Sequence, residues 1–130
     1  MKKIITGLFT LAALTVSLHA YDQAERIKDM QSMESAMSQI QKGILYNNKK
    51  MVLQSIEKLK KASSSVEIAP KTEMDYSSYF AKRQSENIRK YADKIKKNIE
   101  AGHKHGAAMN YTKVLDQCIS CHNKIRKWDQ

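Results

Sequence analysis

The two cysteines of the chain stand three residues apart near its C-terminus, in the sequence Cys118-Ile119-Ser120-Cys121-His122. At about 100° per residue, a helix would place Cys121 about 60° to one side of Cys118 and His122 about 40° to the other. The three side chains would then share one helix face within roughly one turn. One group could then be held by two thiols and an imidazole together, so the motif constrains how the rest of the chain packs.

A C-x-x-C-H sequence in an exported protein is the attachment site of a c-type haem. The thiols add to the haem vinyl groups, and the histidine ligates the iron. We therefore expect one covalent haem c, attached through Cys118 and Cys121, with His122 as the proximal iron ligand.

Other uses of the cysteines compete with this interpretation. A thioredoxin-like redox pair lies at a strand-to-helix junction in a βαβ context, and the chain has no strand-like alternation. A zinc site could combine the cysteines with His103 and His105, but the order and spacing fit no common zinc template. Two cysteines packed in a core would explain the pair but not the histidine that follows Cys121.

Residues 1–20 have the composition of a secretory signal. Lys2 and Lys3 form a basic start, residues 4–18 are an uncharged apolar run, and cleavage is expected after Ala20. A helix of fifteen residues spans about 22 Å, which is short of the roughly 30 Å hydrocarbon layer of a membrane. We therefore expect a cleaved signal, a mature domain of residues 21–130 and a periplasmic location, since bacteria complete c-type attachment outside the cytoplasm.

Composition and apolar spacing favour helices, because glycine is scarce at 4 residues and proline occurs once. Helices are predicted at residues 22–46, 49–62, 78–101 and 107–127. The first has apolar residues at steps of three and four, as in a bundle helix: Ile27, Met30, Met33, Met37, Ile40 and Ile44. The last is expected to direct these side chains inward: Val114, Leu115, Cys118, Cys121, His122 and Ile125.

The predicted connections define the topology. Asn47-Asn48 is a turn, Ser63-Ser64-Ser65 is expected to end the second helix, and residues 102–106 break the chain before the last helix. A longer loop containing Pro70 precedes the third helix, and Tyr76, Tyr79 and Phe80 are expected to fold its end onto the core. The fold class is therefore all-α, as an antiparallel up-down-up-down four-helix bundle with the haem near the end of the last helix.

Two stretches resemble the cytochrome c prime superfamily. One is Cys118-x-x-Cys121-His122-x-x-Ile125-Arg126, which departs from the family only at Ile125, where an aromatic residue is usual. The other is Arg26-x-x-x-Met30, similar to the family's arginine followed four residues later by the residue on the distal side of the iron. The resemblance covers the mature chain and implies that Arg26 contacts a haem propionate. Arg126, one turn after His122, is a second possible haem contact.

Methionine at the distal position points to the low-spin, methionine-ligated branch of that family. Met30 lies nine residues from Tyr21 and His122 eight from Gln130, which puts both about 12 to 14 Å along their helices from one end of the bundle. Met33, about 4.5 Å further along, remains a competitor, whereas Met37 is about 10 Å too deep. A distal position without methionine also stays open, because methionines at this spacing commonly fill cores.

These residues predict a monohaem electron carrier and no enzyme activity, since His122 and Met30 would fill both axial positions. The alternative is a five-coordinate carrier or sensor of nitric oxide or carbon monoxide with the same fold. The net charge of +10, with lysines in every helical segment, predicts an acidic redox-partner protein. We expect no nucleic-acid binding and no stable membrane insertion after signal cleavage, and a homodimer stays open.

Overall fold

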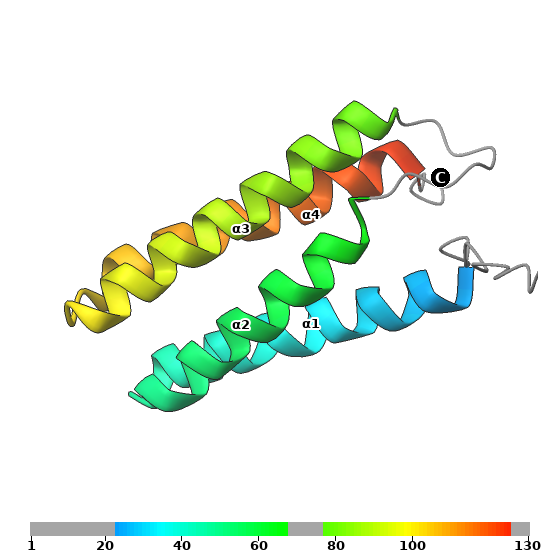
Figure 1. Ribbon diagram of the computed structural model, residues 1–130. Helices are drawn as coiled ribbons and strands as arrows, with labels where there is room; N and C mark the ends of the chain where they lie inside the picture. Colours follow the sequence, from blue (N-terminus) through cyan, green and yellow to red (C-terminus); the bar gives the residue numbers. More distant parts are fainter. Residues whose placement is uncertain (1–22, 68–76, 126–130) are drawn as a thin grey trace, which may run out of the picture.

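The computed structural model describes residues 23–67 and 77–125, and this part of the chain is helical throughout apart from its turns (Figure 1). Its elements in chain order are α1 (Gln23–Leu45), α2 (Lys49–Ser65), α3 (Ser78–Glu100) and α4 (Lys104–Ile125). The predicted all-α class is therefore confirmed for the described ranges. The expected signal, the loop with Pro70 and Tyr76, and Arg126 lie outside the described residues.

Each helix packs against the next one along the chain, and α1 touches α4 much less than any of these neighbours touch each other. Figure 1 shows α1 beside α2 and α3 beside α4, with the start of α1 and the end of α4 at the same end of the molecule. The sparse contact leaves the side between α1 and α4 the most open part of the bundle. No helix in the described ranges is both long and apolar enough to cross a membrane.

The apolar faces predicted from helical spacing form one core. Its fully buried large side chains are Ile40, Val52, Ile56, Leu59, Ile95 and Val114. Met33 and Met37 are buried as well, whereas Ile27 is 51% exposed and Leu115 43% exposed. The expectation that these last two residues point into the core is wrong, because both line the open side between α1 and α4.

Asn47 and Asn48 make the predicted turn between α1 and α2. Asn47 has a φ of 56°, in the left-handed region that asparagine tolerates better than most residues. Asn48 caps α2 by accepting a hydrogen bond from the Met51 N–H at 2.9 Å. The Lys104 ammonium at the start of α4 donates to the Asn47 side-chain oxygen, which ties α4 to this turn.

The three serines at 63–65 do not end α2 as expected, but form its last turn. The hydroxyls of Ser63 and Ser64 both donate to the Lys60 carbonyl, at 2.9 and 3.0 Å, so their polar groups are satisfied inside the helix. Ser85 of α3 donates to the Ser63 carbonyl and accepts from the Arg89 guanidinium at 2.7 Å. Packing against α3 thus holds the last turn of α2 in place.

Two further expectations about the ends of α3 and α4 are wrong. Tyr79 is 73% exposed and does not fold onto the core, although Phe80 is half-buried. The helix predicted from residue 107 begins at Lys104, with Gly106 inside it. Gly102, with a φ of 78°, makes the break instead, in a conformation that glycine adopts without strain.

Candidate functional site

A cavity of about 950 Å³ lies between α1 and α4, and α3 closes its inner side. The cavity forms in the most open part of the bundle, because α1 and α4 contact each other little. Apolar residues from the three helices line it, among them Met33, Met37, Ala81, Ile88, Leu115 and Ile119. Small-molecule and cofactor sites measure about 300 to 1,000 Å³, and this cavity lies near the upper end of that range.

The C-x-x-C-H motif forms part of the α4 wall. Cys118, Cys121 and His122 all line the cavity, so the helix brings the three predicted residues to one face. Both cysteines are half-buried free thiols, and His122 is exposed at the cavity edge. His122 therefore faces the cavity, as expected of an inward side chain, but it is not buried in the core.

The surroundings of the two thiols raise their pKa values. Burial raises the pKa of Cys118, partly offset by a backbone hydrogen bond that lowers it. Burial, followed by the neighbouring Cys118, raises the pKa of Cys121 to about 11. Both groups therefore stay protonated at neutral pH, whereas a reactive redox C-x-x-C pair has a lowered thiol pKa. The environment disfavours the thioredoxin-like alternative.

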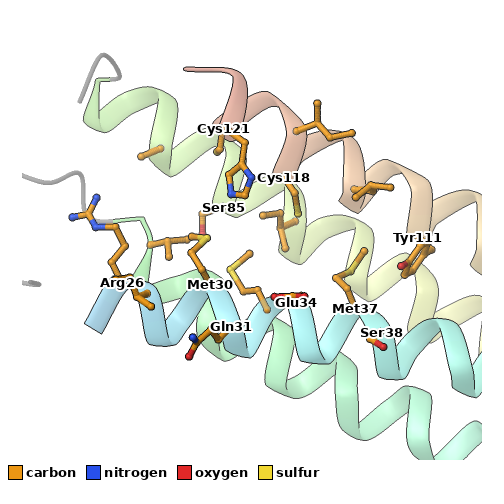
Figure 2. Close-up of a pocket in the computed structure, with 18 of the residues that line it drawn as sticks. Arg26, Met30, Gln31, Glu34, Met37, Ser38, Ser85, Tyr111, Cys118 and Cys121 are labelled. Carbon is orange, nitrogen blue, oxygen red and sulfur yellow. The ribbon is translucent and has the colours of Figure 1, made fainter. Parts of the chain in front are cut away.

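Met30 lies on the opposite wall, half-buried on α1. Figure 2 shows its side chain directed from α1 toward the part of α4 that bears Cys118 and Cys121. Met33 lines the same cavity and is 6% exposed, and Met37 lines it next to Tyr111 farther along. The structure thus brings Met30 together with the motif, and it keeps Met33 in the same cavity.

Arg26, one turn before Met30, also lines the cavity, and Figure 2 shows its guanidinium at the outer end. Several polar residues of the lining were not anticipated from the sequence, among them Glu34 and Tyr111. Glu34 follows Met30 by four residues, and Tyr111 precedes Cys118 by seven, so helical spacing alone would have put each on the same face as its neighbour. Burial, and then the nearby Cys118, raises the pKa of Tyr111.

His103 and His105 are not brought near the cysteines. They lie at the opposite end of α4, which is about 20 Å along the helix axis from Cys118. Within residues 23–67 and 77–125, no three side chains of the histidine, cysteine, aspartate and glutamate types gather as a metal site would require. The zinc site weighed from the sequence therefore has no counterpart in the described geometry.

Comparisons of this chain with protein-family models, with curated proteins and with solved structures give no match. The assignment of the site rests on its own residues. The α4 wall offers two protonated thiols beside an imidazole, a set of groups that can bind a partner covalently through sulfur and ligate a metal through nitrogen. The facing wall adds a thioether, in Met30.

Proposed function

We propose that this chain is a monohaem c-type cytochrome of the cytochrome c prime superfamily that carries single electrons. One observation carries the proposal: Cys118, Cys121, His122 and Met30 line the same cavity from two facing helices. The motif alone predicts attachment, and the shared cavity supports the proposal because it offers space for the group and a thioether, in Met30, on the wall that faces the motif.

The chemistry of the thiols suits covalent attachment. Each S–H group adds across a vinyl C=C bond, with sulfur bonding to one carbon and hydrogen to the other, so no net electron is gained or lost. The raised pKa values keep Cys118 and Cys121 as thiols, the form in which both the sulfur and the hydrogen are present. Arg26, at the outer end of the cavity, would pair with a propionate.

The axial ligands decide the kind of cytochrome. Haem, when bound, supplies a reversible one-electron change at its iron. His122 on one side and Met30 on the other would leave no open position for a substrate, so we propose no enzyme activity. A thioether ligand raises the reduction potential relative to a second histidine, and burial by the apolar walls tunes it further.

The antiparallel up-down-up-down topology belongs to the same proposal. It is supported by the short connections at residues 46–48 and 101–103, each of which joins two helices that pack together. Residues 1–20 would act as the secretory signal and leave a periplasmic protein, in line with their basic start and apolar run. An acidic protein would be the redox partner.

The test is spectroscopic. The protein is produced in a host competent for c-type attachment, denatured, and extracted with acidified acetone; we expect the pigment to stay with the polypeptide. The native ferrous protein should then have a low-spin spectrum that carbon monoxide does not change. Pigment that extracts completely would contradict the haem assignment, whereas a high-spin ferrous spectrum with rapid carbon monoxide uptake would favour the gas-binding alternative.

A further inference from the structure

Net charge is distributed unevenly among the helices, although basic residues occur in all four. The α1 sequence has three basic and three acidic residues, and α4 has three basic and one acidic. By contrast, α2 has five basic and one acidic, and α3 has seven basic and three acidic. The excess of positive charge therefore lies on the two helices that do not flank the open side of the cavity.

Six exposed residues of α3 form a single line on its surface, which we call the α3 basic stripe: Tyr79, Arg83, Glu86, Lys90, Lys94 and Lys97. Their steps of four, three, four, four and three keep them on one helix face over about 27 Å. The one acidic member, Glu86, lies 3.9 Å from the Lys82 ammonium. No salt bridge joins Arg83, Lys90 or Lys97 to another described residue.

The stripe faces away from the cavity. Ser85 and Ile88 line the cavity from α3. Lys90 follows them by five and two residues, which turns its side chain about 140° and 160° away from theirs around the helix. A surface bound to the stripe would therefore leave the opening between α1 and α4 uncovered.

We infer that the α3 basic stripe docks on an anionic lipid surface. Lysines at the surface of an anionic membrane are attracted without any specific contact. The cations of the stripe run from Arg83 to Lys97, about 21 Å at a rise of about 1.5 Å per residue, and a row of this length suits a broad charged plane. Tyr79 ends the row as an exposed aromatic residue, a type enriched where protein meets the membrane interface. The inference does not depend on a haem.

An acidic protein fits the stripe less well. The centres of protein interfaces are depleted in lysine and need buried aromatic, arginine or apolar anchors. Between Arg83 and Lys97 the stripe offers only Glu86 and lysines.

The test measures co-sedimentation of the secreted protein with vesicles at low ionic strength. One set contains equal parts of phosphatidylcholine and phosphatidylglycerol, and the other contains phosphatidylcholine alone. Mass spectrometry first confirms that residues 1–20 are absent, since that apolar run could bind lipid by itself. We expect binding to the anionic vesicles only, weakened by salt.

Two variants of equal charge change locate the surface. The stripe variant carries R83Q, K90Q, K94Q and K97Q, and the control carries K28Q, K42Q, K49Q and K50Q, all at exposed positions of α1 and α2. Each cation removed from the stripe should weaken vesicle binding about fivefold, and the control should bind nearly as the wild type does. Circular dichroism verifies that both variants fold.

Three results would overturn the inference. In the first, the wild-type protein does not bind anionic vesicles. In the second, it binds neutral vesicles equally well. In the third, the stripe variant and the control variant lose vesicle binding to the same extent. Wild-type protein that binds poly-L-glutamate but not the anionic vesicles would assign the stripe to an acidic protein instead.

Discussion

Met30 of α1 and Cys118 of α4 lie on opposite walls of one cavity, although α2 and α3 separate them in the chain (Figure 2). This relationship links a methionine, which by itself would be ordinary core filler, to the C-x-x-C-H motif. It also makes the proposed ligand set testable one residue at a time, because Met30, Met33 and Met37 lie on the same wall at different depths.

If the proposed ligation by Met30 holds, replacing Met30 by leucine should convert the ferrous protein from low-spin to high-spin. Leucine keeps a similar volume, so the cost in free energy of unfolding should stay below about 1.5 kcal/mol, but it removes the sulfur that we propose as the second iron ligand. The expected variant binds carbon monoxide within the mixing time of a spectrophotometer, whereas the wild type does not. Absorption spectra of the reduced protein with and without carbon monoxide measure both changes.

Met33→Leu is the matched control, since Met33 lines the same cavity and is even more buried. We expect this variant to remain low-spin and inert to carbon monoxide. The reverse pattern, with Met33→Leu becoming high-spin and Met30→Leu unchanged, would transfer the distal ligand to Met33. If neither change alters a spectrum that is already high-spin, methionine ligation is wrong.

Each thiol should supply one covalent bond to haem. Cys118→Ala and Cys121→Ala are each expected to retain haem through the other thioether, and the double variant should lose all pigment on denaturation in acidified acetone. Mass spectrometry of the denatured protein counts the bound group directly. Retention of pigment by the double variant would mean that neither cysteine is an attachment point.

The thiols of haem-free protein should resist alkylation at neutral pH. Because burial raises the pKa of Cys121 to about 11, its thiolate forms well above the usual value near 8.5. Iodoacetamide should therefore modify Cys121 slowly at pH 8 in the folded state and quickly once urea unfolds the chain. Peptide mapping over a pH series gives the pH at which the alkylation rate of Cys121 reaches half its maximum. Fast modification of folded protein at pH 7 would contradict the buried environment.

The same shift makes haem-free protein less stable in alkali. The folded-state pKa lies above the unfolded one, so the unfolded thiol ionises first as the pH rises. The contribution to stability is fully present below about pH 8.5 and is lost as the pH rises through about 11. Urea midpoints should fall across this window in wild-type protein, and less so in Cys121→Ala.

The sequence allowed most of the helices and the motif face to be predicted, because both depend on local spacing. Periodicity identified Ile40, Ile56 and Ile95 as core residues, and all three are fully buried. It could not distinguish the core from an open cavity, so it assigned Leu115 and His122 to the interior. How deeply a side chain is buried depends on which helices approach each other, and α1 contacts α4 only sparsely.

Local signals also failed where tertiary contacts decide the outcome. Three consecutive serines favour a helix end, but packing against Ser85 of α3 extends α2 through them. Tyr79 and Phe80 look alike in sequence, yet only Phe80 is half-buried, and the Lys124 ammonium lies 5.8 Å from its ring centre. The sequence gives the charge of each helix once the helix bounds are known, but the direction in which the α3 basic stripe faces needs the helix arrangement.

A side chain at Gly43 should destabilise the protein, because α1 and α2 approach closely there. A Cβ at this position would lie 2.5 Å from the Val52 methyl carbon Cγ2 and 3.1 Å from the Asn48 carbonyl oxygen. The Asn48 N–H also donates to the Gly43 carbonyl at 2.8 Å, so the turn cannot easily move aside.

Gly43→Ala gains about 1 kcal/mol of helix propensity but overpacks the contact, at a cost of about 1 to 3 kcal/mol. We expect a net loss of about 1 kcal/mol in the free energy of unfolding, measured by urea denaturation. Gly106→Ala is the control: the three atoms nearest to its new methyl group all belong to the end of the flexible Asn98 side chain, which can rotate away. That variant should be at least as stable as the wild type, and a Gly43→Ala protein of equal stability would show that the two helices can separate without cost.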